Sequence, residues 1–373
     1  MIYDVVHLTT VHSRGDTRIF VKQCSSLAKY YKLALLVADG LGNENKNNID
    51  IIDIGKYSGR FNRLYKGAKD IYERALMLDA SVYHIHDPEL IPIGVKLEKS
   101  GKKVIFDAHE DFPKQVLTKP YLPMFLKRIV GFFAIFGEKI YCSKLSGIIG
   151  ATPYITTKFS RINNNVININ NFPRIDELQT INNPRRKIGT VCYIGGISVE
   201  RGILEILEAL LLTKNKARLA LAGKFYDAQL GVDIKKLIGW DRTEFLGFVG
   251  RKEITELLST VQVGMVTLHP TPNYLDSLPV KLFEYMCAGI PVIASDFPLW
   301  QDIVIKNKCG LCVDPKSPQE IADAIDYLIE NPTIADEMGR NGFRAIQNEF
   351  NWAIEEQKLL KFYESILNED KTN

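Results

Sequence analysis

Short apolar runs alternate with amphipathic segments along almost the whole chain, and this alternation limits the possible fold more than any other feature. Such a pattern predicts strands that pair in parallel, with helices on both faces of the sheet. At 373 residues the chain is too long for one ordinary core. We therefore predict an α/β protein with two doubly wound domains in tandem. The predicted strands are YDVVHL, KLALLVA, IDIIDI, SVYHIH, KKVIFDAH, GIIGAT and NVINI, followed by IGTVCYI, ARLALAG, TEFLGFV, VQVGMVTL and GLCVD.

The alternation is interrupted once, which places the domain boundary. Residues 170–187 are polar, contain two prolines and show no periodicity, as expected of a linker. We assign 1–172 to a first Rossmann-like domain, 173–187 to the linker, 188–348 to a second Rossmann-like domain and 349–373 to a closing helical segment. Because doubly wound domains bind ligands at the carboxyl ends of their strands, we expect a ligand cleft where the two sets of strand ends face each other. The predicted helices of the second domain include 202–212, 228–238 and 251–259.

Charge is unevenly spread along the chain. The net charge is only +3, but residues 1–180 hold 25 Lys and Arg against 18 Asp and Glu, and residues 181–373 hold 22 against 26. A basic first half indicates contact with an anionic surface or substrate. The longest uncharged apolar run, at 129–137, has about half of the ~20 residues that span a membrane. Met1 leads directly into a strand pattern and not a secretory signal, so we expect a cytoplasmic protein.

Two pairs of residues have spacings that a metal site could use. Cys309 and Cys312 are separated by two residues, and His84 and His86 share one face of a predicted strand. Neither pair has further ligands nearby in the sequence. We therefore predict no metal site, and we expect reduced cysteines.

Two helix starts in the second half carry cations where the helix dipole disfavours them. Gly195 and Gly196 follow the strand TVCYI, and Arg201 stands at the start of the next helix. In the stretch DSLPVKLFEYMCAGIPVIAS, Pro279 suits a first helical position, and Lys281 lies in the first turn. A pyrophosphate would explain both cations, because it gains from two charges and two sets of free N–H groups.

Simpler interpretations of both stretches stay open. The first could be an ordinary glycine-rich turn with a solvated arginine. In the second, Glu284 lies three residues after Lys281, and the two could form an i,i+3 ion pair worth a few tenths of a kcal/mol.

Several ordered motifs together resemble family 4 retaining glycosyltransferases of the GT-B fold. Asp276, seven residues and Glu284, followed by CAGIPVIAS, resemble the family's E-x7-E signature. YIGGISVERGI is similar to its phosphate loop, DAHEDFP to its histidine-bearing loop, and NEFNWAIEEQKLLKFYESIL to its closing helix, which crosses back to the first domain. This chain departs from the pattern at Asp276, where the family has glutamate, at Gly196, where it has arginine, and at Arg201, where it has lysine.

The resemblance implies transfer of a sugar from a nucleotide-sugar donor with retention of configuration, without a metal ion or other cofactor. Glu284 would bond the ribose, Asp276 the transferred sugar, and Arg201 and Lys281 the diphosphate. A uridine donor is favoured and a guanosine donor is possible. The expected catalytic residues are His109, Asp276 and Glu284, and the expected donor-binding residues are Gly195, Gly196, Arg201, Phe248, Val249, Leu278, Pro279, Val280, Lys281 and Glu284.

Acceptor contacts are expected in the first domain. By the same resemblance, His109 at the end of a strand would bond the transferred sugar. His86 and Glu89 are expected to line the acceptor side. For the first loop, an Asp-capped helix with a surface arginine is an equal alternative. The expected acceptor-binding residues are Gly15, Asp16, Arg18, His86 and Glu89.

The segment 113–144 mixes lysines and arginine with Phe and Tyr, which is typical of a helix in a membrane interface. A helix buried on one face is the alternative. We expect contact with anionic lipid at the inner face of the plasma membrane, a glycan or lipid-linked oligosaccharide acceptor, no nucleic-acid partner, and a role in O-antigen or capsule synthesis in a bacterium. A nucleotide-sugar epimerase of the same fold and a non-catalytic sugar-nucleotide-binding subunit remain alternatives.

Overall fold

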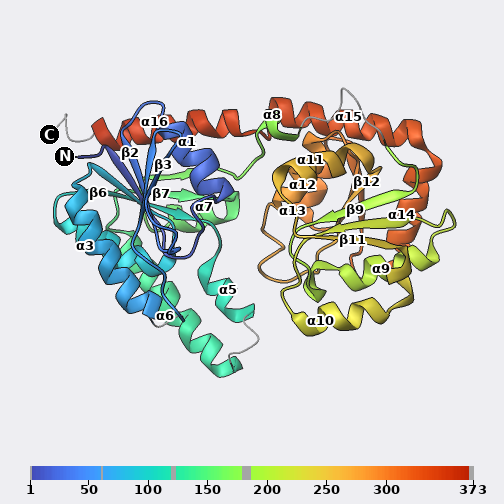
Figure 1. Cartoon of the computed structure of the whole chain (residues 1–373), viewed down its shortest axis with the longest axis horizontal. Coiled ribbons are helices and arrows are strands. Elements are labelled where there is room, and N and C mark those ends of the chain that lie inside the picture. The colour runs from blue at the N-terminus through green and yellow to red at the C-terminus, as the bar shows by residue number, and fades with distance from the viewer. Residues whose placement is uncertain (1, 60–61, 119–122, 179–185, 369–373) are drawn as a thin grey trace. The chain divides into compact units, whose positions relative to one another are not determined.

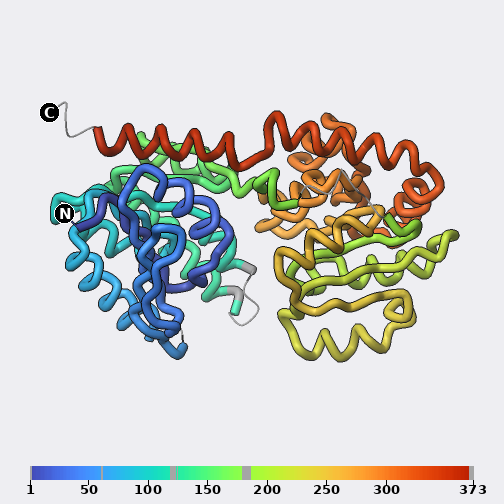
Figure 2. The backbone as a smooth tube through the Cα atoms, turned by 45° about the horizontal axis from the view of Figure 1, so that its top comes forward, coloured from blue at the N-terminus to red at the C-terminus, as the bar shows by residue number. Residues whose placement is uncertain are grey.

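The computed structural model describes the chain apart from residues 1, 60–61, 119–122, 179–185 and 369–373. It consists of two compact units, shown in Figure 1 and, as a tube, in Figure 2. The first unit contains residues 1–171 and 353–373, and the second contains residues 172–352. Each unit is built around its own sheet.

The first unit has an eight-stranded sheet in the order β3-β4-β2-β1-β5-β6-β7-β8. All neighbouring strands are parallel except β3, a short edge strand that pairs antiparallel with β4. Each predicted apolar run of this half forms a strand, and only β3 was not predicted, because its sequence ENK is polar. The strands are β1 (Val5–Leu8), β2 (Leu33–Val37), β3 (Glu44–Lys46), β4 (Ile49–Asp53), β5 (Val82–Ile85), β6 (Lys103–Ala108), β7 (Gly147–Gly150) and β8 (Val166–Asn168).

Helices connect these strands, as the parallel pairing requires. Thr152 starts α7 by accepting a bond from the backbone N–H of Ile155, and Pro153 follows it at a position where no N–H is needed. The helical elements are η1 (Thr17–Cys24), α1 (Ser25–Leu27), η2 (Arg63–Gly67), α3 (Ala68–Leu78), η3 (Pro88–Leu90), α4 (Ile91–Lys99), α5 (Phe112–Thr118), α6 (Met124–Cys142), α7 (Pro153–Ser160) and α16 (Trp352–Asn368).

The C-terminal helix α16 packs on the sheet of the first unit. Gly147 in β7 makes room for it, because a Cβ there would lie 2.6 Å from the ring of Phe362 and 2.8 Å from Ile366. The hydroxyl of Tyr363 lies 2.7 Å from Nδ1 of His84. Figure 2 shows α16 (red) running along this unit. The C-terminal helix is therefore part of the core of the first unit.

The second unit has a six-stranded parallel sheet in the order β11-β10-β9-β12-β13-β14. Counted along the chain this is the order 3-2-1-4-5-6 of the Rossmann fold, whose ligands bind beside the first strand, where the strand order reverses. That first strand is β9. The strands are β9 (Thr190–Ile194), β10 (Arg218–Ala222), β11 (Thr243–Gly247), β12 (Val263–Val266), β13 (Val292–Ser295) and β14 (Gly310–Val313).

The predicted helix at 228–238 is broken into three pieces. Leu237 is extended, with ψ of 140°, and a Cβ on Gly239 would lie 2.2 Å from the carbonyl oxygen of Leu207. Close packing of this turn on α9 therefore overrides the helical pattern. The helical elements of the unit are α8 (Ile175–Leu178), η4 (Val199–Arg201), α9 (Ile203–Leu212), α10 (Ala228–Asp233), η5 (Ile234–Lys236), η6 (Ile238–Arg242), α11 (Arg251–Thr260), α12 (Val280–Cys287), α13 (Pro298–Val304), α14 (Pro318–Glu330) and α15 (Pro332–Asn348).

Apolar side chains cover both faces of the second sheet. One cluster contains Cys192, Ala220 and Val266, and the other contains the alternating residues Val191, Leu219 and Met265. This is the pattern of a sheet buried on both sides. The short helix α8 lies within the stretch assigned to the linker, whose residues 179–185 fall outside the described residues.

Candidate functional site

The turn that follows β9 holds the first part of the candidate site. After Ile194 the chain continues through Gly195 with φ of +126°, a conformation that favours glycine. The turn is tightly packed, because a Cβ on Gly223 would lie 1.8 Å from the carbonyl oxygen of Gly195. A Cβ on Gly195 would lie 3.4 Å from Nζ of Lys281 and 3.8 Å from Nη1 of Arg201. The glycine turn and the two cations singled out in the sequence therefore meet at one point.

Arg201 is held at this point by the junction between η4 and α9. Gly202 forms the junction with φ of +72°, and a Cβ there would lie 1.9 Å from the carbonyl oxygen of Thr267. The guanidinium of Arg201 lies 5.4 Å from the ring centre of Tyr226 and 5.8 Å from that of Tyr274. Its Nε is buried and has no hydrogen-bond partner among the described residues. The arginine is thus packed in place while part of its hydrogen-bonding capacity stays unused.

Lys281 is the second residue of α12 and is only 7% exposed. Its Nζ lies 3.4 Å from the centre of the Tyr193 ring, and within the described part of the chain it has no hydrogen-bond partner. Burial, and then the charge of Arg201, lowers the pKa of Lys281 well below its usual value. A buried amine without an acceptor is costly. An anion bound beside Gly195 would supply the missing acceptor.

Glu284 lies one turn beyond Lys281 and is paired with a residue from another helix. Its Oε1 lies 2.5 Å from Nη1 of Arg251, the first residue of α11, and Arg251 also bonds Glu177 at 2.9 Å. This pair forms in place of the i,i+3 pair between Lys281 and Glu284 that the sequence allowed. Lys281 therefore takes no part in this ion pair.

The other predicted donor-binding residues lie in the loops around this point. Asp276, Leu278 and Val280 are half-buried in or next to the segment before α12. Pro279 is the N-cap of α12, because its ψ of 120° is extended, and so it is not the first helical residue as predicted. The structure brings this segment together with the glycine turn through Lys281.

The residues predicted to contact the base follow β11. Phe248 is 73% exposed, with Nζ of Lys224 4.5 Å from the centre of its ring. Val249 is half-buried and packs against the core of the unit. An exposed ring beside a carboxyl-terminal strand end offers a flat apolar surface for a planar ligand.

Three tyrosines belong to this site and were missed in the sequence. Tyr193, Tyr226 and Tyr274 surround the two cations. A Cβ on Gly196 would lie 2.4 Å from the ring and hydroxyl of Tyr226. The tyrosine thus occupies the space next to Gly196, the position where the family pattern has arginine. No local sequence motif predicts these tyrosines, because they come from three separate segments.

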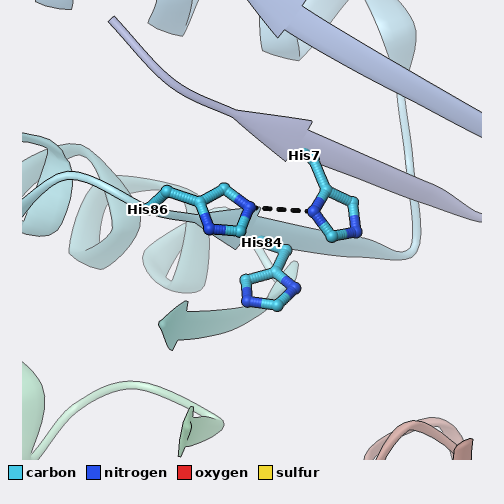
Figure 3. Close-up of side chains that lie close together, drawn as sticks. All are labelled: His7, His84 and His86. Atoms are coloured by element: carbon cyan, nitrogen blue, oxygen red, sulfur yellow. Dashed lines mark hydrogen bonds between the residues drawn. The ribbon is translucent and has the colours of Figure 1, made fainter. Parts of the chain in front are cut away.

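The first unit contains a cluster of three histidines, drawn in Figure 3. His7 of β1 lies beside His84 of β5 in the parallel register, so both side chains share one face of the sheet. Nδ1 of His7 lies 2.9 Å from Nε2 of His86. His84 stacks on His86 with ring centres 4.5 Å apart and an angle of 22° between the planes. His7 supplies the third histidine that was missing from the sequence pattern.

This cluster is better suited to hydrogen bonding than to holding a metal. The ligand nitrogens of the three histidines lie within 4.8 Å of one another. However, imidazole lone pairs lie in the ring plane, so the two stacked rings of His84 and His86 direct them side by side and not to a common point. Burial lowers the pKa of His86 to about 3 and those of His7 and His84 well below the usual value, so all three are neutral.

Asp107, at the end of β6, connects this cluster to His109. It is fully buried and accepts bonds from Nε and Nη2 of Arg18 at 2.8 and 2.6 Å and from Nε2 of Gln23 at 2.8 Å. Nε2 of His109 lies 3.0 Å from Oδ2 of Asp107. Burial alone would raise the pKa of Asp107, but the charge of Arg18 and then the contacts with His109 hold it well below its usual value. The group of His86, Asp107 and His109 also has metal-ligand spacing, but its carboxylate is already saturated with donors.

In the first loop, the structure differs in part from the predicted acceptor-binding roles of Gly15, Asp16 and Arg18. Asp16 caps η1 by accepting bonds from the N–H groups of Arg18 and Ile19 at 2.9 Å, as the capping alternative expected. Arg18 is 4% exposed, so it is neither a surface arginine nor open to an acceptor, because Asp107 draws it into the interior. Gly15 has open space around its Cα and leaves the loop accessible.

The two acceptor-binding residues predicted in the next loop, His86 and Glu89, differ in their exposure. His86 is 2% exposed and lies in the histidine cluster, so its side chain does not line a surface as predicted. Glu89 is half-buried, with Oε1 2.8 Å from both Nε of Arg63 and the hydroxyl of Thr10. His12, which was not singled out in the sequence, packs on His109 with ring centres 4.9 Å apart.

The segment 113–144 forms α5 and α6, and its residues 119–122, including Lys119, lie outside the described residues. α6 buries one face, which includes Gly131, Glu138 and Cys142, as the alternative expected, and it exposes many large apolar side chains on the rest of its surface. Within the described residues, no helix is both long and apolar enough to cross a membrane. The exposed apolar residues of α6 are Phe125, Ile129, Val130, Phe132, Phe133, Ile135, Phe136, Ile140 and Tyr141.

Comparison with known proteins agrees with this architecture. Residues 175–345 match the family Glycosyl transferases group 1. The uncharacterized glycosyltransferase MJ1069 of Methanocaldococcus jannaschii is 25% identical over 182 residues, which cover 48% of this chain and 45% of that protein. The chain thus spans less than half the length of the first curated relatives that it matches.

Solved structures resemble nearly the whole chain. Sucrose-phosphate synthase from Thermosynechococcus elongatus has a TM-score of 0.79 at 18% identity, covering 98% of this chain and 99% of that one. Anabaena HepE, solved in complex with UDP-glucose, has a TM-score of 0.73 at 16% identity, covering 97% of this chain and 100% of that one. These likenesses confirm the predicted GT-B fold, with two parallel-sheet, Rossmann-like domains.

Proposed function

We propose that this chain, whose residues 175–345 match the family Glycosyl transferases group 1, transfers a sugar from a nucleotide-sugar donor to a hydroxyl of a glycan acceptor with retention of configuration. One observation carries the proposal: among the described residues, the buried Nζ of Lys281 has no acceptor, and it lies beside Arg201 at a glycine turn. Two cations at one point, beside the N-terminus of α12, suit a diphosphate.

The chemistry follows from this placement. Lys281 and Arg201 would stabilise the negative charge that develops on the nucleoside diphosphate as it leaves the sugar. Backbone N–H groups at Leu278 and Val280 would add donors at the start of α12. Because these cations already supply the compensating charge, we expect transfer without a metal ion.

Other groups would orient the donor. Glu284 would accept bonds from the ribose hydroxyls, which requires Arg251 to share or release it. Asp276 would bond the transferred sugar, and the base would rest near Phe248 and Val249. A uridine donor is favoured, in keeping with the UDP-glucose bound to the structurally similar HepE, and a guanosine donor is the alternative.

The acceptor is proposed to be a lipid-linked or polysaccharide glycan, such as a capsule or O-antigen precursor, at the inner face of the plasma membrane. The exposed apolar side chains of α6 are flanked by basic residues, among them Arg128, Lys139 and Lys144. Apolar and basic residues on one helix favour peripheral binding to anionic lipid.

The test is to incubate the protein with a panel of nucleotide sugars, with and without membrane extract, and to follow nucleotide release with and without EDTA. Release that depends on the extract and resists EDTA would support the proposal. Isomerised donor without acceptor would identify an epimerase, and binding without either reaction would identify a non-catalytic module.

A further inference from the structure

We propose that Asp107 holds His109 in the tautomer that carries its proton on Nε2, so that Nδ1 of His109 is a fixed hydrogen-bond acceptor for a sugar hydroxyl. The inference deepens the proposed glycosyl transfer and rests on it. Asp107 acts here as a positioning residue, and His109 is the residue that would touch the ligand.

The proton position follows from the donors around Asp107. The buried carboxylate is ionised next to Arg18, and an ionised carboxylate can only accept hydrogen bonds. Nε2 of His109 lies 3.0 Å from Oδ2 of Asp107. An unprotonated Nε2 would point its lone pair at this charge, which is repulsive. Nε2 therefore carries the proton and donates it to Asp107.

The neighbouring histidine leads to the same assignment. Nδ1 of His86 lies 3.3 Å from Nε2 of His109 and 3.5 Å from Oδ2 of Asp107. If Nδ1 of His86 is unprotonated, it also accepts from His109. If it is protonated, it donates to Asp107 beside His109. Both arrangements leave the proton of His109 on Nε2.

On the side of His86 away from His109, a buried chain of polar groups holds the His86 ring in place. Nε2 of His86 contacts Nδ1 of His7 at 2.9 Å, and Nε2 of His7 lies 3.4 Å from the hydroxyl of Tyr363. Tyr363 belongs to α16, near the end of the chain. The imidazole positions are therefore fixed by packing across strands β1, β5 and β6 and a helix from the C-terminus.

The other nitrogen of His109 is available to a ligand. Among the described residues, Nδ1 of His109 has no hydrogen-bond partner, and the side chain is 18% exposed. The neighbouring His12 is directed to carboxylates instead: its Nδ1 lies 3.2 Å from Asp16 and its Nε2 3.7 Å from Asp87. In the neutral ring with its proton on Nε2, Nδ1 of His109 is thus an acceptor, suited to orient a hydroxyl without taking its proton.

Replacing His109 by Asn or by Gln tests the contributions of its two ring nitrogens separately. The polar atoms of Asn lie near the position of Nδ1, and those of Gln reach the position of Nε2. We expect His109→Asn to keep at least about ten times the kcat of His109→Gln and His109→Ala, the effect of one hydrogen bond. Equal activity of Asn and Ala, or a more active Gln variant, would overturn the proposal.

A spectroscopic test does not depend on catalysis. The chain has six histidines, so ¹⁵N-histidine spectra can be assigned by comparison with His109→Gln. We expect the wild-type His109 to show a protonated Nε2 and an unprotonated Nδ1, and Asp107→Asn to lose this preference. A protonated Nδ1 in the wild type would refute the assignment. A wild type with this tautomer but no transfer from any donor would instead count against the proposed function alone.

Discussion

The side-chain nitrogen of Lys281 lies 3.4 Å from the centre of the Tyr193 ring, in a buried position where it has no hydrogen-bond partner among the described residues. This is a costly arrangement for the folded chain by itself. Arg201 at the same glycine turn adds to the cost through like-charge repulsion. A bound anion would offset both costs, because it would accept a hydrogen bond from Lys281 and its charge would oppose the repulsion. The proposed function and the stability of this site are therefore linked.

Replacement of Lys281 by Met should therefore separate function from stability. We expect transfer to fall at least ~100-fold, the scale of losing a charge-stabilising group. The free energy of unfolding should rise by about 1 kcal/mol, because an unsatisfied buried amine is removed. Urea denaturation and nucleotide release test the two effects. A variant with normal transfer would remove Lys281 from the site.

Binding of UDP should take up a proton at Lys281. Burial lowers the pKa of the free amine, and a bound diphosphate would raise it again. Affinity should therefore fall as pH rises from the pKa of the free site to that of the complex. Calorimetry in buffers of different ionisation enthalpy measures the uptake. Lys281→Met is the control for the proton taken up by the phosphate itself, and equal uptake by both proteins would contradict this prediction.

Two glycines of the proposed anion site, Gly202 and Gly196, should differ sharply in their tolerance of alanine. At Gly202, with φ of +72°, the new Cβ would meet the backbone of Thr267 at 1.9 Å, and we expect a loss of more than about 2 kcal/mol in unfolding free energy. At Gly196 the obstacle is the end of Tyr226, which is 70% exposed and can rotate away, so the loss should stay below about 1 kcal/mol. Similar losses at both positions, measured by chemical denaturation, would show that this difference in surroundings does not matter.

Arg18→Met should destabilise the first unit by about 3–5 kcal/mol at neutral pH, because it leaves Asp107 buried without its ion-pair partner. Asp107 has a lowered pKa in the folded wild type, so its contribution is present above the unfolded pKa and is lost as pH falls through the folded one. The difference between variant and wild type should therefore shrink below about pH 4. Denaturation curves at several pH values test this, and a difference independent of pH would point to lost packing only.

The exposed apolar face of α6 should bind anionic liposomes. We expect the double variant Phe132→Ser/Phe136→Ser to lose most of its flotation with anionic vesicles, and high salt to weaken binding of the wild type. Ile238→Ser, which alters an exposed apolar residue of the second unit, is the control. Flotation that is unaffected by salt and by lipid charge would refute the electrostatic part of the prediction.

The local sequence was enough to predict most elements and the cations of the anion site. Strands such as β9 and β10 are short apolar runs, so they can be recognised from a few consecutive residues. Arg201 and Lys281 stood out because cations oppose the dipole at a helix start. Local patterns failed at the helix predicted for 228–238, where contact between Gly239 and α9 decides the backbone.

What the sequence by itself determined is the alternation of strands and helices, the glycine turn and the positions of its cations, because each depends on residues close together in the chain. Only the tertiary structure decided that Tyr226 fills the space beside Gly196, that Arg18 is buried against Asp107, and that His7 joins His84 and His86. These contacts join residues far apart in sequence. They arise because parallel strands bring the same face of distant segments into register, which no local pattern records.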